Sequence, residues 1–147
     1  NLADFFVSGS DSSNTFVNSN FSQSRRIQLT YAWFNQSQNN GLTFVSNNVS
    51  AGKTIVRNIS SWTQTNLTWM DNVTVGTDIL YYNITGLSPS TNYDVHNDTV
   101  IDFTLTTDES GKLPLFWINH NTTQKMMRVL AVSEEAAIEE PVQFWWI

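Results

Sequence analysis

The most frequent chemically meaningful motif in this sequence is the triplet Asn-x-Ser/Thr, whose asparagine side-chain nitrogen accepts an N-linked glycan. The chain contains 17 Asn, 16 Ser and 17 Thr, and these counts alone would give about four such triplets. Nine are present without proline in the middle position, and their asparagines are Asn20, Asn35, Asn48, Asn58, Asn66, Asn72, Asn83, Asn97 and Asn121. The excess and the even spacing predict an N-glycosylated protein. The alternative is a surface that is merely rich in asparagine.

The residue types that catalysis would need are sparse. The two histidines, His96 and His120, lie 24 residues apart without ligand spacing, and we expect both at the surface. The stretch 9–12 (GSDS) lacks the Gly-x-Ser-x-Gly pattern of a nucleophile elbow. No glycine-rich loop that would cradle a phosphate is present. We therefore expect no enzyme, and no cofactor beyond covalent N-glycans.

One group of acidic residues leaves a calcium site open as an alternative. Asp98, Asp102, Asp108 and Glu109 would supply oxygen ligands if their loops converged. Calcium takes six to eight oxygen ligands, and no loop here has EF-hand spacing. The simpler interpretation is that residues 108–111 (DESG) form a hairpin turn. We therefore expect no metal site.

Charge and composition exclude several classes of protein. Only 14% of residues are charged and the formal net charge is −6, so a nucleic acid would be repelled. No run of 18 apolar residues exists, and we expect no membrane span. The chain has no cysteine. Many glycosylation triplets without disulfides favour a secreted archaeal cell-surface protein. Because the sequence does not begin with methionine, we expect that Asn1 follows either a cleaved signal peptide or an artificial boundary.

The elements that must position these residues are short alternating segments, separated by Asn, Ser, Gly and Asp. In residues 25–34 (RRIQLTYAWF), Ile27, Leu29, Tyr31 and Trp33 share one face, as expected of a strand. The other expected strands are 4–7, 42–49, 53–59, 79–84, 93–96, 101–105, 113–118 and 125–132. Only 133–140 (SEEAAIEE) has helix signals. Strands at spacings of about 10 residues predict one all-β domain, an antiparallel β-sandwich.

Both ends of the chain carry apolar strands. We interpret 1–24 as an N-terminal strand (Leu2, Phe5, Phe6 and Val7) plus a flexible serine-rich and asparagine-rich segment, and 25–147 as the sandwich domain. The chain ends with Phe144, Trp145, Trp146 and Ile147, whose burial is worth more than about 10 kcal/mol as an upper bound. This segment is either the last strand of its own sandwich or a strand donated to a neighbouring subunit. For donation we prefer the N-terminal strand, because its tether is long.

A corner motif connects two of the expected strands. In 86–93 (GLSPSTNY), Leu87 points inward, Pro89 fixes a turn and Tyr93 opens the next strand, with its hydroxyl bonded back across the corner. This tyrosine corner resembles the Leu-x-Pro-x-Thr-x-Tyr motif of the fibronectin type III family. The following 106–113 (TTDESGKL) is similar to sandwich repeats of archaeal surface glycoproteins. The resemblance covers about residues 79–118. It implies an immunoglobulin or fibronectin III-like sandwich with extra terminal strands.

Together these features favour a structural subunit of an extracellular surface polymer, a homopolymer joined by strand addition. One alternative is an adhesin or carbohydrate-binding module, in which Trp62, Trp69, Tyr81 and Tyr82 would stack on sugar rings. Most of these aromatics lie in apolar strand patterns, which favours the core instead. A viral or other surface glycoprotein domain is a third possibility.

Overall fold

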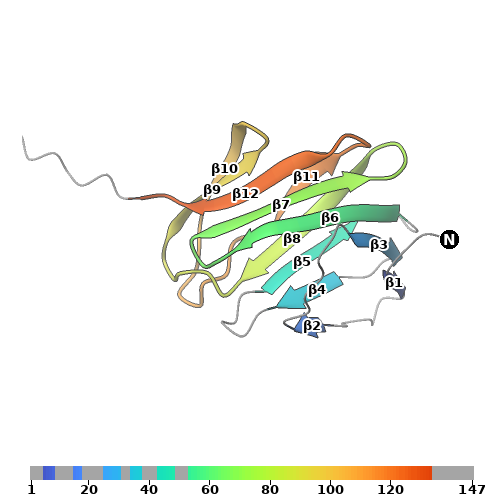
Figure 1. Ribbon diagram of the computed structural model, residues 1–147. Helices are drawn as coiled ribbons and strands as arrows, with labels where there is room; N and C mark the ends of the chain where they lie inside the picture. Colours follow the sequence, from blue (N-terminus) through green and yellow to red (C-terminus); the bar gives the residue numbers. More distant parts are fainter. Residues whose placement is uncertain are drawn as a thin grey trace, which may run out of the picture.

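The computed structural model describes residues 5–8, 15–17, 25–30, 34–37, 43–48 and 53–133 of the chain, with side chains described at 26–27, 54–61 and 63–133. These residues form twelve strands and no helix (Figure 1). Apart from two short parallel pairs, β1 with β3 and β2 with β4, all strand pairs are antiparallel. The prediction of an all-β, antiparallel fold is therefore confirmed.

The strands form two sheets. The seven-stranded sheet has the order β1 (Phe5–Ser8), β3 (Arg25–Thr30), β6 (Lys53–Trp62), β7 (Asn66–Val73), β12 (Lys125–Ala131), β9 (Asn92–Asn97) and β10 (Val100–Thr106). The five-stranded sheet has the order β11 (Phe116–His120), β8 (Asp78–Thr85), β5 (Thr43–Asn48), β4 (Phe34–Ser37) and β2 (Thr15–Val17).

One hydrophobic core joins the two sheets. Strands β7 and β8 alternate strictly between buried and less buried side chains, as expected when one face of each sheet is covered. The core takes Leu67 and Trp69 from β7 and Leu80, Tyr82 and Ile84 from β8, which belong to different sheets. Two antiparallel sheets that share one core are consistent with a β-sandwich.

Several boundaries differ from the sequence prediction. The expected strand 25–34 is two elements, β3 and β4, which belong to different sheets. The segment 8–24, interpreted as a linker, contains β2. The expected strand 113–118 begins only at Phe116, after Pro114, which has no backbone N–H to donate to a ladder. The expected helix 133–140 lies outside the described residues except for Ser133.

The largest omission is β7, which lies inside the seven-stranded sheet between β6 and β12. Its inward positions are Leu67, Trp69, Asp71 and Val73, and all four are fully buried. Because a carboxylate occupies one core position, the apolar alternation that identifies a strand is interrupted at Asp71. A buried charge therefore hid this strand from sequence reasoning.

The tyrosine corner forms as predicted and crosses from one sheet to the other, since β8 and β9 belong to different sheets. The Tyr93 hydroxyl accepts a hydrogen bond from the Ser88 backbone N–H (3.0 Å) and donates one to the Gln64 carbonyl (2.6 Å). Leu87 is buried, as expected. Tyr93 thus ties the corner to the turn between β6 and β7.

The second stretch of the resemblance packs against this corner. The Thr107 hydroxyl donates to the Ser88 carbonyl (2.7 Å) and accepts from the Thr91 N–H (2.9 Å). Gly111 has a φ of +80°, and a Cβ there would lie 2.1 Å from the Leu87 carbonyl oxygen. Only glycine fits at this position, because any side chain would collide with the corner backbone.

Candidate functional site

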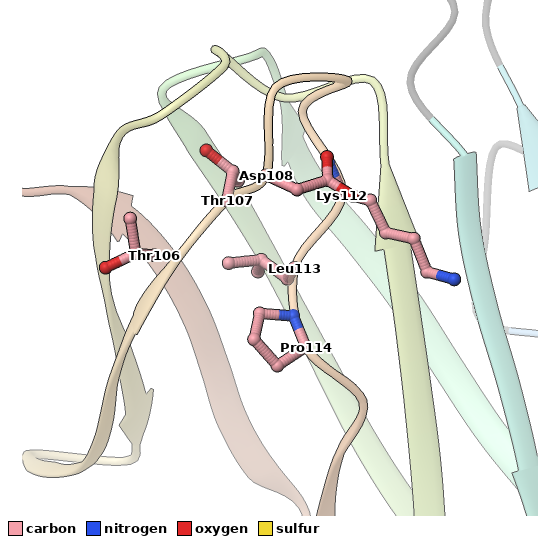
Figure 2. Close-up of a pocket in the computed structure, with 6 residues that line it drawn as sticks. All are labelled: Thr106, Thr107, Asp108, Lys112, Leu113 and Pro114. Atoms are coloured by element: carbon pink, nitrogen blue, oxygen red, sulfur yellow. The ribbon is translucent and has the colours of Figure 1, made fainter.

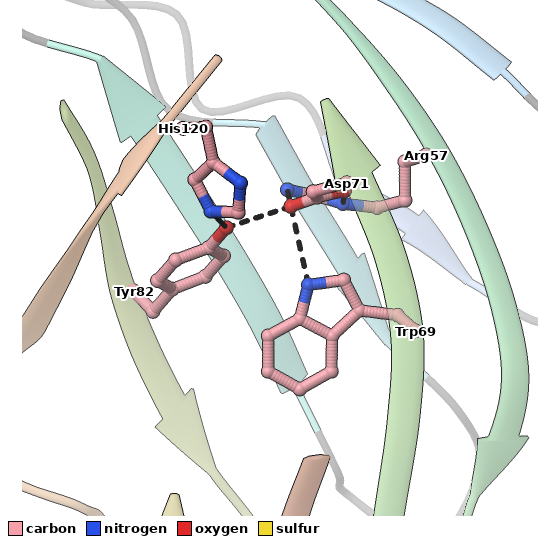
Figure 3. Close-up of polar contacts among 5 residues, drawn as sticks. All are labelled: Arg57, Trp69, Asp71, Tyr82 and His120. Atoms are coloured by element: carbon pink, nitrogen blue, oxygen red, sulfur yellow. Dashed lines mark hydrogen bonds and ion pairs between the residues drawn. The ribbon is translucent and has the colours of Figure 1, made fainter. Parts of the chain in front are cut away.

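The most concentrated polar chemistry in the described residues is a buried network at the interface of the two sheets (Figure 3). Arg57 lies on β6, Trp69 and Asp71 on β7, Tyr82 on β8 and His120 on β11. The side chains of all five residues are fully buried. The network therefore joins three residues of the seven-stranded sheet to two of the five-stranded sheet.

Asp71 is the centre of this network. Its two carboxylate oxygens accept hydrogen bonds from Arg57 Nε (2.8 Å) and Arg57 Nη2 (2.6 Å), which is a bidentate ion pair. The same carboxylate accepts from Trp69 Nε1 (3.1 Å) and from the Tyr82 hydroxyl (2.7 Å). Four donors satisfy one carboxylate, which is the condition for burying a charge pair without a large penalty.

The network reaches the fifth residue through Tyr82. The Tyr82 oxygen lies 2.8 Å from His120 Nε2. Because the single hydroxyl proton of Tyr82 is given to Asp71, the Nε2–H of His120 must be the donor in this contact. Nδ1 of a neutral His120 then carries no proton, and this buried atom has no hydrogen-bond partner. The geometry thus assigns the neutral Nε2–H tautomer to His120.

Burial and the ion pair shift the ionisation of these groups. Burial raises the pKa of Tyr82 well above its ordinary value, and the Asp71 carboxylate adds to this rise. Burial alone would lower the pKa of Arg57, but the Asp71 carboxylate outweighs it and raises that pKa. Burial lowers the pKa of His120, partly opposed by Asp71. The network therefore holds one fixed ion pair and two neutral rings near neutral pH.

This network connects the sheets and offers no access to a substrate. The guanidinium carbon of Arg57 lies 5.9 Å from the Tyr82 ring centre, and the Trp69 and Phe116 rings lie 5.4 and 5.3 Å from that ring. Aromatic rings and apolar residues thus enclose the polar atoms. We assign the network a structural role, as a polar tie between the two sheets.

Sequence reasoning missed this network and placed His120 wrongly at the surface. The signal was present, because Arg57 lies between Ile55 and Ile59, in the phase of β6 that points inward. Asp71 occupies the matching phase of β7 and pairs with Arg57 in the sheet register. Opposite charges at facing inward positions of neighbouring strands predict a buried ion pair.

The predicted glycan acceptors differ in their exposure. Of the side chains that are described, Asn58, Asn66 and Asn121 are exposed, and Asn72, Asn83 and Asn97 are half-buried. At Asn66 the Thr68 hydroxyl of the same triplet donates to the asparagine Oδ1 (2.7 Å), since residues i and i+2 share one face of a strand. Asn35 lies on β4 and Asn48 on β5, where only the backbone is described, and Asn20 lies outside the described residues.

The predicted subunit-interface residues are only partly covered. Phe5, Phe6 and Val7 form β1 with Ser8, at an edge of the seven-stranded sheet, where β1 pairs in parallel with β3. The remaining interface residues, Leu2, Phe144, Trp145, Trp146 and Ile147, lie outside the described residues. The assignment of these residues to an interface stays a prediction.

A second feature of the surface is the side of the molecule where both sheets end. Among the described strands, β10 pairs only with β9 and β11 pairs only with β8, so each has an edge that no described strand covers. The Phe103 ring of β10 lies 6.1 Å from the Phe116 ring of β11, which brings these two edges together. Four large apolar side chains are at least half exposed on this side: Val100, Ile101, Leu115 and Trp117. We refer to these two strands as the open edges.

A hollow of about 350 Å³ lies beside the end of β10 (Figure 2). It is lined by the end of that strand and the turn after it: Thr106, Thr107, Asp108, Lys112, Leu113 and Pro114. Asp108 Oδ1 accepts from the Ser110 N–H, the Ser110 hydroxyl and the Lys112 N–H. These bonds, that of the Ser110 hydroxyl above all, lower the pKa of Asp108. The Asp108 carboxylate therefore stabilises the turn that follows β10.

The calcium alternative finds no support in the described part of the chain. Within 53–133, no group of three or more acidic, histidine or cysteine side chains is placed to hold a metal ion. Asp98 instead accepts the Met126 N–H (2.8 Å), and Asp102 accepts from Asn97 (3.0 Å). Among the described residues, no helix has the length and apolar character needed to cross a membrane.

Comparison of the chain with known proteins finds no matching family model, no similar curated protein and no similar solved structure. Function must therefore be inferred from the geometry of the described residues: two sheets joined by a buried polar network, with predicted acceptor asparagines and two uncovered strand edges.

Proposed function

We propose that this chain is a non-enzymatic structural subunit of an extracellular, archaeal surface polymer, which is a pilus-like fibre, a sheath or a surface layer. The subunit is N-glycosylated and assembles into a homopolymer when a strand of one copy adds to a sheet of the next. We also propose that the β-sandwich belongs to the immunoglobulin or fibronectin III-like class. The tyrosine corner from Leu87 to Tyr93 supports this fold assignment. The observation that carries the proposal is the open edge of β10.

An open edge presents unpaired backbone N–H and C=O groups that can pair with another chain. Natural sheets protect such edges with lysine, with proline or with a bulge. Strand β10 (VIDFTLT) has no lysine and no proline, although it carries Asp102 and a register irregularity between Ile101 and Phe103. Val100 is 59% exposed and Ile101 is 50% exposed. An added strand would pair with this edge and cover these side chains, as in donor-strand complementation.

The chain has candidate donors at both ends. The preferred donor is β1, which is only four residues long and pairs in parallel with β3. A parallel strand pair is slightly less stable per residue than an antiparallel one. Moving β1 from β3 onto another copy of the chain would therefore cost little free energy. The other candidate is the apolar segment 144–147.

The alternative function is an adhesin or carbohydrate-binding module. Two of the four aromatic residues proposed to stack on sugars are not available for this role. Trp69 and Tyr82 are fully buried, so neither can stack on an incoming sugar. The side chain of Trp62 lies outside those described, and Tyr81 is half-buried. The polymer subunit is the function that the described geometry supports better.

Substitution of Val100 and Ile101 by lysine tests this proposal, because lysine on an edge strand opposes strand addition. Val75→Lys is the matched control, since Val75 is 70% exposed in the turn between β7 and β8 and is not part of β10. The full-length glycosylated chain is compared by electron microscopy and by sedimentation velocity. We expect polymers from the parent and from the Val75 variant, and monomers from the double lysine variant. Polymers of undiminished length from the double variant would contradict strand addition at β10.

A further inference from the structure

The outer face of the five-stranded sheet carries exposed apolar side chains beside a glycan acceptor. On β11, Trp117 is 50% exposed, and Leu115 just before this strand is 56% exposed. On β8, the outward positions are Ile79, Tyr81, Asn83 and Thr85, all half-buried. A half-exposed tryptophan beside an exposed leucine leaves apolar surface in contact with water, which is unfavourable in free energy. A group that covers this patch would therefore stabilise the protein.

The sheet register places the acceptor next to this patch. Trp117 pairs directly with Tyr81, and Phe116 pairs with Tyr82. The next outward position on β8 is Asn83, which is therefore a diagonal neighbour of Trp117, at about 7–8 Å. Tyr81, Asn83 and Thr85 are two residues apart in sequence, so all three side chains project from the same face.

We propose that the first sugars of an N-glycan on Asn83 fold back over Tyr81 and Trp117 and cover this patch. This inference rests on the proposed function, because it requires that Asn83 is glycosylated. A pyranose ring has an apolar face of C–H groups and a rim of hydroxyls. The C–H face packs against an aromatic ring, and the hydroxyls remain in water or bond to amides.

The polarity of this face fits a neutral sugar. The outward side chains of β8 and β11 are Ile79, Tyr81, Asn83, Thr85, Trp117 and Asn119, and none of them is charged. Asn119 is exposed and lies across from Ile79, where its amide can bond to a sugar hydroxyl. Among the groups that could cover the patch, the glycan is favoured because its attachment point, Asn83, lies within the patch.

The test compares two acceptors that both lie on strands. Asn83→Gln removes the glycan beside the aromatic patch, and Asn58→Gln removes one on β6, where the cross-strand neighbour is Met70. Each substitution is made in the full-length chain from a glycosylating host and, as a second control, in unglycosylated chain. Glycan occupancy is measured by mass spectrometry, and the melting temperature is measured for each protein.

We expect the loss of the Asn83 glycan to lower the melting temperature by about 2–4 °C. This loss should disappear when Trp117 is replaced by serine, and the Asn58 glycan should show no dependence on Trp117. Acrylamide should also quench Trp117 more strongly in the Asn83 variant than in the parent. Equal losses with tryptophan and with serine at position 117 would overturn the inference.

Three further results would also overturn it, and the first two separate it from the proposed function. Native chains that carry glycans at other acceptors and form polymers, yet have Asn83 unmodified, would refute only this inference. Chains without a glycan at any acceptor would refute the glycoprotein proposal as well. If the quenching of Trp117 varies with protein concentration, a second copy of the chain covers the patch instead.

Discussion

Replacement of Asp71 by alanine is the most informative perturbation of this fold. The substitution removes the acceptor of four hydrogen bonds and leaves the Arg57 guanidinium fully buried without its carboxylate. Breaking one side of a buried ion pair costs about 3–5 kcal/mol. The Tyr82 hydroxyl and the Trp69 N–H each lose their hydrogen bond to Asp71, which acts in the same direction.

The size of the effect makes it easy to measure. A domain of this length has an unfolding entropy that converts each kcal/mol into about 3 °C of melting temperature, so Asp71→Ala should lower the melting temperature by about 9–15 °C. Typical domains are stable by only about 5–15 kcal/mol, so a loss of this size removes a large fraction of the total stability. Urea unfolding followed by tryptophan fluorescence gives the change in free energy directly.

Two variants complete this experiment. Asp102→Ala removes an exposed carboxylate from strand β10 and should change the free energy of unfolding little. Arg57→Met combined with Asp71→Leu removes both charges and should recover most of the stability, because a buried ion pair can be replaced by apolar residues of similar volume. A loss below about 1 kcal/mol for Asp71→Ala would refute the structural role of the network.

Three further predictions follow from single residues. Burial lowers the pKa of His120, so the unfolded chain takes up a proton near pH 6.5 while the folded chain does not. Stability should therefore fall as the pH drops below about 6.5, down to the folded pKa, and His120→Gln should flatten this dependence in urea titrations at several pH values. Tyr93→Phe leaves two backbone groups of the corner without a partner and should lower the free energy of unfolding by about 1–3 kcal/mol. Gly111→Ala drives a Cβ into the Leu87 carbonyl and should cost more than about 2 kcal/mol, whereas Gly76→Ala, with open space around it, should cost about 1–2 kcal/mol.

Each of these predictions has a result that would contradict it. Stability that rises, or stays level, as the pH falls from 6.5 would show that His120 is not held neutral in the fold. A phenylalanine at position 93 without loss of stability would mean that the corner does not depend on its hydroxyl. Equal melting temperatures for the two glycine variants would contradict the close approach at Gly111.

The sequence predicted those parts of the fold in which the local pattern agrees with the final environment. Alternation identified β8 and β9, and the corner between them forms with the expected Tyr93 bond. The motif succeeds because its proline turn, buried leucine and tyrosine bond all act within a few residues. Sequence reasoning could not separate β3 from β4, because both are short and pair in different sheets.

The buried polar network depends on contacts between residues that are distant in the sequence, which local patterns do not contain. Residues 57, 71, 82 and 120 lie on four strands and meet only after these strands have formed two sheets. A histidine or an aspartate in a polar-looking stretch is usually exposed, and burial becomes favourable only when partners are supplied. The partner of His120 is Tyr82 on the neighbouring strand β8, and Tyr82 in turn donates to Asp71 of the other sheet. None of these partners is near His120 in the sequence, which explains why His120 was placed wrongly.

Electron microscopy of native material released from cells without denaturation tests the central claim most directly. We expect regular fibres or lattices whose only repeating mass is this chain with its glycans. A variant with lysine in place of Val100 and Ile101 should form no fibres or lattices. Dispersed monomers of uniform size in the native material would contradict the proposed polymer.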